Sequence, residues 1–375
     1  MNDETRLLFT ESGFSFFSRN GRMKIYWKTL LSSPITTAEE LSRHLPIDRE
    51  KLEKVIARYP MRINSYYLSL IRHEDDPLWK QAVPDIAEIE DTWGADDPLT
   101  EEAQSPVPNL IHRYPDRAVF LISSDCAMFC RYCMRKRKIG HPFVVNEHTI
   151  EAGIRYIRDN THIRDIIFSG GDPLLINDDR LREILKQARA IPHVEIIRIH
   201  TRIPCTLPQR ITPELCDMLK AFHPLYINTH FNHPDEITPE SSMACAMLAD
   251  AGIPLGCQTV LLKGVNDDPE IMKHLMQKLI SIRVKPYYIH QSDLVRGTGH
   301  FHTHPEKGLE IMEKLRGHTS GLCVPHFMID LPGGGGKIPL LPEYVQKKEK
   351  DRWLIRNYEG KSFEYPIKEK DNGHS

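Results

Sequence analysis

The sequence lacks the features of a membrane protein, a secreted protein or a nucleic-acid-binding protein. Its 375 residues include 49 basic and 51 acidic side chains, so the net charge of −2 favours neither an anionic lipid surface nor a nucleic acid. No apolar run approaches the ~18 residues that cross a bilayer. The opening residues, MNDETRLLF, have neither the basic start nor the apolar stretch of a secretory signal, and we expect no such leader. These absences predict a cytoplasmic protein with no membrane and no nucleic acid among its partners.

Cysteine is scarce and unevenly placed. Isolated cysteines in apolar surroundings are usually small buried hydrophobes, and they suit a reducing compartment better than a disulfide framework. Five of the eight cysteines are of this kind: Cys205, Cys216, Cys245, Cys257 and Cys323. The other three, Cys126, Cys130 and Cys133, stand close together and need a separate explanation.

Residues 1–105 predict a helical N-terminal region that ends in a linker. The segments TTAEELSRHL and DREKLEKVIARY combine helical spacing of apolar residues with the N-cap residues Thr37 and Asp48. The acidic, proline-bearing stretch DDPLTEEAQSPVPNL at 96–110 predicts the linker.

Beyond the linker, predicted strands and helices alternate. Amphipathic segments such as DDRLREILKQARAI and PEIMKHLMQKLISI separate apolar, β-branched runs. These runs predict strands at 118–124, 165–171, 194–202, 224–231, 254–262, 285–293 and 326–332. Such alternation predicts an α/β fold with a parallel sheet, and six or seven units favour a complete or partial (β/α) barrel. We expect this barrel at 106–330, a loop and a short C-terminal segment at 331–375, and ligands at the carboxyl ends of the strands.

The three clustered cysteines have the spacing C-x3-C-x2-C directly after the first predicted barrel strand. A structural zinc site normally has four nitrogen or sulfur ligands in paired spacing, and the sequence has no second C-x2-C. A four-iron cluster usually takes four cysteines, so three thiolates would leave one iron open to another ligand. The spacing favours such a cluster over zinc and over three unrelated loop cysteines.

A second unusual segment, DLPGGGGKIPLLP at 330–342, places Lys337 after four consecutive glycines. Four glycines cost backbone entropy on folding, which disfavours a purely structural turn. A phosphate-binding P-loop does not fit, because Ile338 stands where that motif has Ser or Thr and no helix is predicted to follow. A lysine on such a tether at a strand end is well placed to bond to a carbonyl cofactor.

The cysteine spacing resembles that of the radical S-adenosylmethionine (SAM) enzymes, and SGGDPL at 169–174 resembles their glycine-rich motif. More narrowly, CAMFCRYCMRKR, SGGDPL, LRGHTSG and PGGGGKIP resemble the lysine 2,3-aminomutase family in content and order, over about residues 105–345. The resemblance implies a partial barrel of the radical SAM type and three cofactors: a [4Fe-4S] cluster, SAM and pyridoxal 5′-phosphate (PLP). In this family the open iron binds SAM, cleavage of SAM yields an alkyl radical, and PLP carries the migrating amino group.

The resemblance also assigns roles to individual residues. It places the cluster on Cys126, Cys130 and Cys133, and PLP on Lys337. The other assignments are the PLP contacts Arg113, Tyr114 and Arg117; the SAM contacts Ser169, Gly170, Gly171, Asp172, Arg202, His230 and Gln258; and the substrate contacts Arg135, Asp293 and Asp330. An arginine at position 135, near the substrate carboxylate, would explain positive charge beside the cluster, whereas Lys136, Arg137 and Lys138 can equally be ordinary surface.

The implied reaction moves the amino group of L-lysine from C2 to C3 and gives β-lysine. Asp293 and Asp330 would hold the distal ammonium of the substrate, although an aspartate at a strand end can also cap a turn. Relatives that act on glutamate lack this pair. Three alternatives stay open: arginine or another basic substrate, supply of β-lysine for modification of elongation factor P, and a non-catalytic iron–sulfur redox or sensor protein. Lys337 disfavours the last, because a redox carrier needs no PLP anchor.

The family further implies an external reductant such as flavodoxin or ferredoxin, and a homo-oligomer. Two features of the sequence differ from well-known members of the family. His290 stands where they have a tyrosine near PLP. No cysteine follows Cys323, so we do not expect the zinc site that some members have near the C-terminus.

Overall fold

The computed structural model describes residues 8–10, 13–15, 26–141 and 143–368. Most of the N-terminal stretch from which we expect no secretory leader lies outside these residues. The helices are α1 (Tyr26–Ser32), α2 (Ala38–Ser42), α3 (Arg49–Arg58), α4 (Ser65–Leu70), α5 (Pro77–Ala82), α6 (Ala87–Glu90), α7 (Glu147–Asp159), α8 (Asp178–Arg189), α9 (Ile203–Thr206), α10 (Pro213–Leu219), α11 (Pro239–Asp250), α12 (Pro269–Ser281) and α13 (Pro305–Leu315). Within the described ranges, no helix is long and apolar enough to cross a membrane.

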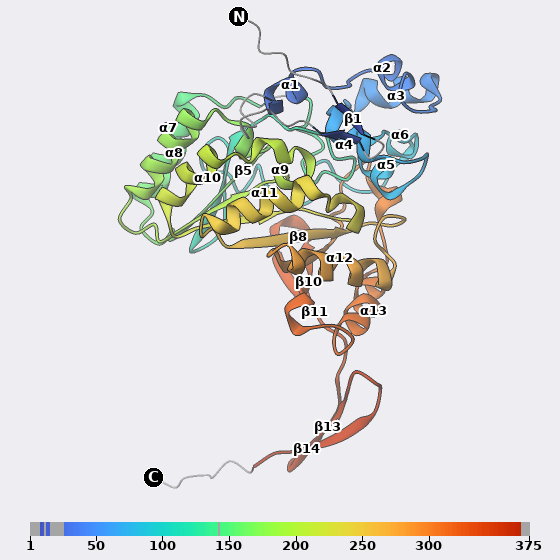
Figure 1. Cartoon of the computed structure of the whole chain (residues 1–375). Helices are drawn as coiled ribbons and strands as arrows, with labels where there is room; N and C mark the ends of the chain where they lie inside the picture. Colours follow the sequence, from blue (N-terminus) through green and yellow to red (C-terminus); the bar gives the residue numbers. More distant parts are fainter. Residues whose placement is uncertain (1–7, 11–12, 16–25, 142, 369–375) are drawn as a thin grey trace, which may run out of the picture.

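A nine-stranded sheet in the order β11-β10-β9-β8-β7-β6-β5-β4-β3 forms the body of the molecule (Figure 1). The strands are β1 (Leu8–Thr10), β2 (Gly13–Ser15), β3 (Leu110–Tyr114), β4 (Arg117–Ser123), β5 (Asp165–Gly170), β6 (Ile196–His200), β7 (Leu225–Thr229), β8 (Leu255–Leu261), β9 (Lys285–Gln291), β10 (His326–Leu331), β11 (Gly336–Leu340), β12 (Val345–Lys348), β13 (Arg352–Arg356) and β14 (Ser362–Pro366). Strands β4 to β10 run parallel, and the antiparallel strands β3 and β11 form the two edges. The seven parallel strands are those that the sequence predicts, so the partial (β/α) barrel is confirmed.

Side chains alternate along the strands between the helical layer and the barrel interior. Phe168 on β5 pairs with Ile199 on β6, and both are fully buried in the apolar core. The residue that follows each of them, Ser169 and His200, lines a cavity inside the barrel. The two-residue period of a strand thus separates a core that stabilises the fold from an interior that can bind ligands.

The N-terminal region is helical and packs against the barrel (Figure 1). The N-caps are confirmed, since Thr37 accepts a hydrogen bond from Glu40 N and Asp48 accepts one from Lys51 N. Buried apolar residues of α1 to α5 belong to the same core cluster as those of the barrel. This shared core joins the two parts, and the boundary near residue 105 remains a prediction.

The stretch at 96–110 is wrongly predicted as a linker. Glu101 is only 4% exposed, and the carbonyl of Pro98 accepts a hydrogen bond of 2.9 Å from Gly333 N. The segment therefore packs against both the basic run after the cysteines and the glycine-rich turn. Of its acids, Glu101 and Asp97 pair within the fold, whereas Asp96 and Glu102 are exposed.

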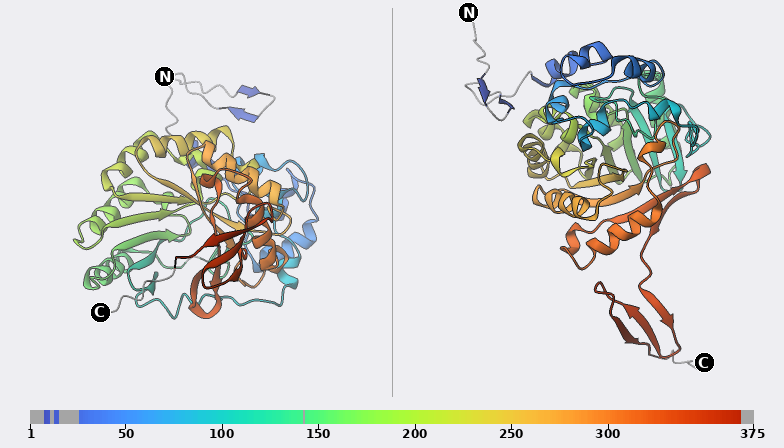
Figure 2. Two further views of the ribbon diagram at one scale, coloured as in Figure 1. Left: turned by 90° about the horizontal axis from the view of Figure 1, so that it is seen from below. Right: turned by 90° about the vertical axis from the view of Figure 1, so that its right-hand side faces the viewer.

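The C-terminal part also differs from the expectation. Lys337 lies not in a loop but on the edge strand β11, after a turn in which Gly333, Gly334 and Gly336 have φ values of 70°, 83° and 85°. Strands β12, β13 and β14 form a separate sheet that extends away from the barrel (Figure 2). Every residue of β14 is exposed, so this sheet has no buried face to produce an apolar alternation in the sequence.

Candidate functional site

One cavity of about 700 Å³ occupies the barrel interior. Every residue that the sequence assigns to the cluster, SAM, PLP or the substrate lies in its wall. These residues are Arg113, Tyr114, Arg117, Cys126, Cys130, Cys133, Arg135, Ser169, Gly170, Gly171, Asp172, Arg202, His230, Gln258, Asp293, Asp330 and Lys337. Ligand sites commonly have volumes of ~300–1,000 Å³, so the cavity is large enough for several small molecules in contact.

The glycines of SGGDPL allow the end of β5 to lie against the cysteine loop. Gly170 has a φ of 143°, and a Cβ there would lie 2.1 Å from the carbonyl oxygen of Ser123. A Cβ on Gly171 would lie 2.2 Å from the carbonyl oxygen of Asp125. The sequence attributes these glycines to close approach of a ligand; in the fold they are required by close approach of the backbone that precedes Cys126.

The cysteine loop is held mainly by the helical N-terminal region. Phe129 N donates to Arg62 O at 2.9 Å, Arg131 N donates to Gln81 O at 3.0 Å, and Asn64 Nδ2 donates to Ala127 O at 3.1 Å. These bonds position the backbone from Ala127 to Arg131 without using any cysteine side chain. The region that the sequence describes only as helical and connective is therefore the scaffold of the loop.

The three clustered cysteines are free thiols. Burial raises the pKa of Cys133 to about 11 and holds the pKa of Cys126 well above its usual value. The described residues contain no group of three or more His, Cys, Asp or Glu side chains arranged to hold one metal ion. In a four-iron cluster each cysteine thiolate binds a different iron.

A buried ionic triad supports the same loop. Glu88, 0% exposed, accepts hydrogen bonds from Arg131 Nη2 at 2.6 Å and from Lys136 Nζ at 2.7 Å. The loss of water contact lowers the pKa of Lys136 to about 8, although the Glu88 carboxylate partly offsets the effect. The two cations lie on either side of Cys133 in the chain, so Glu88 fixes both flanks of that cysteine.

The other basic residues of the run at 135–138 also pair with acids. Arg135 binds Glu101 through two hydrogen bonds, Nε–Oε2 at 3.0 Å and Nη2–Oε1 at 2.7 Å. Arg137 pairs with Asp97, Glu101 and Glu102, and Lys138 pairs with Glu102. Arg135 lines the cavity, whereas Arg137 and Lys138 do not, so Arg135 alone of these three is placed to reach a ligand.

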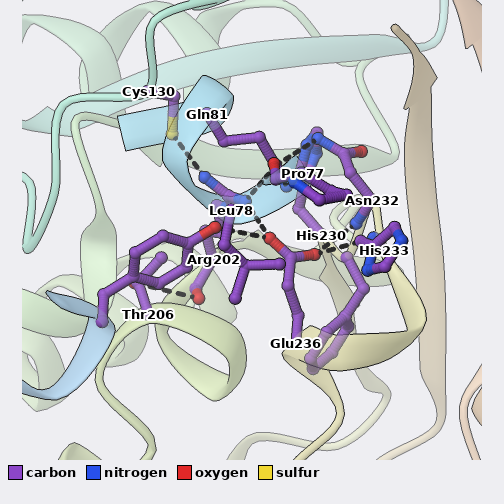
Figure 3. A network of polar contacts seen from close by, with 12 residues as sticks. Pro77, Leu78, Gln81, Cys130, Arg202, Thr206, His230, Asn232, His233 and Glu236 are labelled. Atoms are coloured by element: carbon purple, nitrogen blue, oxygen red, sulfur yellow. Dashed lines mark hydrogen bonds and ion pairs between the residues drawn. The ribbon is translucent and has the colours of Figure 1, made fainter. Parts of the chain in front are cut away.

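Arg202 lies in a network of buried polar groups beside Cys130 (Figure 3). Its Nη1 lies 2.9 Å from Cys130 Sγ, and its Nη2 donates to Gln81 Oε1 at 2.7 Å and to Glu236 Oε1 at 2.6 Å. The sequence assigns Arg202 to SAM; in the fold its guanidinium is directed at a cysteine sulfur and at Glu236.

Asp172 and His230 are also held by protein groups. Asp172 accepts hydrogen bonds from Thr201 Oγ1 at 2.7 Å and Arg202 N at 2.8 Å, while burial raises its pKa to about 6. His230 stacks on Tyr132, whose hydroxyl lies 3.0 Å from His230 Nε2. Burial holds the pKa of His230 well below 6.5, so the ring is neutral at pH 7.

Lys337 and its neighbours bridge the two edges of the barrel. Asp330 on β10 pairs with Lys337 Nζ on β11 and accepts a hydrogen bond of 2.9 Å from Arg113 Nη1 on β3. Tyr114 on β3 accepts a hydrogen bond of 2.8 Å from Lys337 N. Because β3 and β11 are the opposite edges of the sheet, these side chains connect a seam that strand pairing leaves open.

The remaining PLP candidate, Arg117, stacks on the ring of Tyr114 at 3.8 Å and pairs with Asp116. His290 lies in the cavity wall beside Tyr288, with ring centroids 5.3 Å apart. Burial holds the pKa of His290 well below 6.5, and the nearby Lys337 cation acts in the same direction. A neutral imidazole therefore occupies the position where well-known members have a tyrosine.

Asp293 is the exception among the charged groups of the cavity. Within the described parts of the chain, its carboxylate has no hydrogen-bond or ion-pair partner, although it lies near Lys337, Asp330 and Glu101. Loss of water contact raises the pKa of Asp293 to about 7; the Lys337 cation opposes this shift, and the two like-charged carboxylates add to it. A buried carboxylate without a partner would be strongly stabilised by an added cation.

Besides Arg202 Nε, two further polar atoms of the wall lack partners among the described residues. They are Thr229 Oγ1 and Gln291 Oε1, both buried. Buried polar atoms are rarely left unpaired in a finished fold, so both are available to a polar molecule in the cavity. The sequence contains no signal for these two, because a threonine or glutamine near a strand end is common.

Glu88, Glu101, Gln81 and Glu236 were not among the predicted site residues, although each fixes a residue that was. They lie between 34 and 121 positions from the basic side chains that they bind. The excess of acids at 85–102 was the one signal in the sequence that could have identified Glu88 and Glu101 as partners of the basic run.

The chain is similar to known proteins over most of its length. Residues 120–275 match the model of the radical SAM superfamily, and residues 312–373 match the lysine-2,3-aminomutase model. The L-lysine 2,3-aminomutase of Clostridium subterminale is 51% identical over 341 residues, which are 89% of this chain and 82% of that protein. That of Methanococcus maripaludis is 47% identical over 372 residues, 96% of this chain and 85% of that protein.

The glutamate 2,3-aminomutase of Clostridioides difficile is also similar, at 48% identity over 341 residues, 89% of this chain and 81% of that protein. Overall identity therefore does not separate the two substrates named for these relatives. It does establish the wider relationship, because these similarities extend over most of both chains. The chain belongs to the lysine 2,3-aminomutase family of radical SAM enzymes.

Proposed function

We propose that the protein converts L-lysine to β-lysine by moving the α-amino group from C2 to C3. Cys126, Cys130 and Cys133 would hold a [4Fe-4S] cluster, and Lys337 would hold PLP near Arg113, Tyr114 and Arg117. SAM would occupy the cavity between them, against Ser169–Asp172, His230 and Gln258. When bound, the cluster and SAM supply a radical that removes a hydrogen atom from Cβ, and PLP supplies the unsaturated group through which nitrogen migrates.

The observation that carries the proposal is the pairing of the Lys337 ammonium with Asp330 beside the unpaired Asp293. The side chain of Lys337 is chemically the same butylammonium group as the side chain of the proposed substrate. Its ammonium pairs with Asp330 and lies near enough to Asp293 to influence the pKa of that carboxyl. When Lys337 holds PLP, its nitrogen is no longer an ammonium, and the distal ammonium of the substrate would replace it between Asp293 and Asp330.

The other residues of the cavity orient the substrate and exclude water. Arg135 would bind the substrate carboxylate, because a guanidinium pairs bidentately with a carboxylate. Glu101 already holds Arg135 by such a pair, so it would fix the direction of the remaining Nη1 donors. The enclosed barrel protects a reactive radical from solvent and from side reactions.

A basic substrate is favoured over an acidic one by the charges near the seam. Burial is the main cause of the raised pKa of Asp293, and the nearby carboxylates of Asp330 and Glu101 add to it. A glutamate side chain placed there would add another carboxylate, and an unpaired charge in such a pocket is costly. Arginine fits the charge but has a longer, planar head group, so it is the competitor to test beside lysine.

We further propose that the protein is cytoplasmic and receives electrons from a flavodoxin or ferredoxin. The eight free cysteines suit a reducing compartment. We propose a homo-oligomer as well, because the projecting C-terminal sheet exposes Phe363, Tyr365 and Tyr358 at 56%, 59% and 51%. Exposed aromatic residues of this number commonly mark an interface. The molar mass from light scattering after size-exclusion chromatography tests this point.

The reaction itself is tested with L-lysine labelled with ¹⁵N at the α-amino group. Protein reconstituted anaerobically with iron, sulfide, PLP and SAM, and then reduced, should give β-lysine with the label on C3. Label that remains only on C2 after SAM has been cleaved would contradict the proposal. Unlabelled lysine without SAM is the matched control.

A further inference from the structure

Arg202 makes a contact that a SAM-binding arginine does not need. Of its five N–H donors, one on Nη1 is directed at Cys130 Sγ at 2.9 Å, and two on Nη2 bind Gln81 and Glu236. Its Nε is buried without a partner in the described part of the chain. Figure 3 shows the guanidinium between the cysteine sulfur and the Glu236 carboxylate.

The surrounding side chains fix this orientation. Glu236 is 0% exposed, and its Oε2 accepts hydrogen bonds from the backbone nitrogens of Asn232 at 2.6 Å and His233 at 3.0 Å. Gln81 Oε1 accepts a second bond from Asn232 Nδ2 at 3.0 Å. The guanidinium is therefore held by anchored acceptors on one side and is directed at the sulfur of Cys130 on the other, and it lies 5.6 and 5.4 Å from the ring centroids of Tyr67 and Tyr132.

We infer that Arg202 is a positioning residue that sets the reduction potential of the cluster through Cys130. The inference rests on the proposed function, because it requires a cluster on that cysteine. Hydrogen bonds to ligand sulfurs and nearby charge are among the features by which proteins tune iron–sulfur potentials.

The direction of the effect follows from charge. Reduction adds one electron to the cluster and makes it more negative, so a cation bonded to a ligand sulfur stabilises the reduced form. The Glu236 carboxylate opposes this effect, but it lies behind the guanidinium, and electrostatic energy falls with distance. The net influence of the pair is to make the cluster easier to reduce, and the two members act in opposite directions.

The test is a redox titration, followed by electron paramagnetic resonance, of the reconstituted protein without SAM. In Arg202→Gln, the ratio of reduced to oxidised cluster at a fixed potential should fall about tenfold, which equals about 59 mV for one electron. In Glu236→Gln the ratio should rise severalfold. Arg202→Lys keeps the charge and should give a smaller fall than Arg202→Gln.

Arg198→Gln is the matched control. Arg198 also lines the cavity and pairs with an acid, Asp165, but it contacts no cysteine. The ratio of reduced to oxidised cluster in Arg198→Gln should therefore stay within about twofold of the wild-type ratio, because electrostatic energy falls with distance. Iron content is measured in every variant. If Arg202→Gln does not retain the cluster, Arg202→Lys and Glu236→Gln still decide the question.

Shifts in the same direction for Arg202→Lys and Glu236→Gln, or ratios unchanged from the wild type, would overturn the inference. Such results in a protein that converts lysine to β-lysine would leave the proposed function intact. A wild type that holds no cluster after reconstitution would overturn both.

Discussion

The cysteine loop and the barrel seam contrast in how completely their charges are paired. Around the loop, Glu88 binds Arg131 and Lys136, and Glu236 binds Arg202, with every one of these side chains at most 10% exposed. At the seam, Asp293 has no partner within the described ranges, and the Lys337 side chain is 33% exposed. The charged side chains around the loop are paired with one another, whereas Asp293 at the seam is not paired with any described residue.

This difference corresponds to two requirements of the proposed chemistry. A cluster loop has to keep its geometry through every turnover, and buried, fully paired charges provide such rigidity. A lysine that holds PLP has to change its bonding partner, so its ion pair with Asp330 must be exchangeable. Breaking the first region should therefore remove the cluster or destabilise the fold, and breaking the second should remove turnover alone.

The largest expected effect is at the cysteines. Replacing Cys126, Cys130 or Cys133 by alanine should abolish SAM cleavage, because the cluster loses a ligand. The wild type should hold about four irons per chain after reconstitution. Iron analysis and deoxyadenosine release measure the two effects. Cys323→Ala, outside the loop, is the control, and normal SAM cleavage in a loop variant would remove that cysteine from the cluster.

Loss of Lys337 should abolish turnover and leave the cluster in place. Borohydride reduction of the PLP-loaded wild type should attach the cofactor covalently to Lys337, and peptide mapping locates the label. Lys361, exposed on the C-terminal sheet, is the matched control and should remain unlabelled. A label on any lysine other than Lys337 would contradict the assignment of the glycine-rich segment.

Asp293→Ala and Asp330→Ala should each reduce kcat/KM for lysine by about a hundredfold or more. Removing one partner of a buried ion pair typically costs ~3–5 kcal/mol. Both variants should retain iron and PLP, which absorption spectra measure. Normal lysine turnover in both would mean that the two aspartates serve only as turn caps.

Glu88→Gln should destabilise the fold without touching any ligand. It leaves Arg131 and Lys136 buried beside a neutral amide, and the expected loss in the free energy of unfolding is ~3–5 kcal/mol. Glu50→Gln breaks the exposed Lys54–Glu50 pair of α3 and should cost at most ~0.5 kcal/mol. Denaturant unfolding compares the two, and equal losses would contradict the distinction between buried and exposed pairs.

The smallest effect concerns pH. A raised pKa of about 7 means that Asp293 in the ligand-free protein gains its charge only as the pH rises through neutrality. The ionised carboxylate binds an ammonium, so KM for lysine should fall as the pH rises towards this pKa, by up to ~10-fold per pH unit. The substrate ammonium stays charged over this range. The folded state keeps a proton that the unfolded state releases near pH 4. The contribution of this group to the stability of the protein is therefore present below pH 4, falls as the pH rises to about 7, and stays lost above that pH.

Measurements of KM from pH 6 to 8 test the first point. Asp293→Asn should show a flat profile over that range, since it has no carboxylate to ionise. A wild-type profile that is equally flat would place the pKa of Asp293 elsewhere.

The sequence predicted the parallel strands because each is a short apolar run, and it predicted the cysteines and Lys337 because their spacing is local. It did not predict the partners of Arg135, Arg131 or Arg202. Glu101 and Glu88 lie 34 and 43 residues from the arginines they bind, and no local pattern encodes such contacts. The C-terminal sheet was not predicted for a different reason, since strands without a buried face need no apolar alternation.

The contrast at the seam leads to the most direct test of the substrate assignment. It is the ratio of kcat/KM values for lysine and glutamate, measured in parallel with the reconstituted wild type. If Asp293 and Asp330 hold a distal ammonium, lysine should be preferred by about a hundredfold or more, from the cost of an unpaired buried charge. A preference for glutamate, or equal rates for the two, would contradict the account.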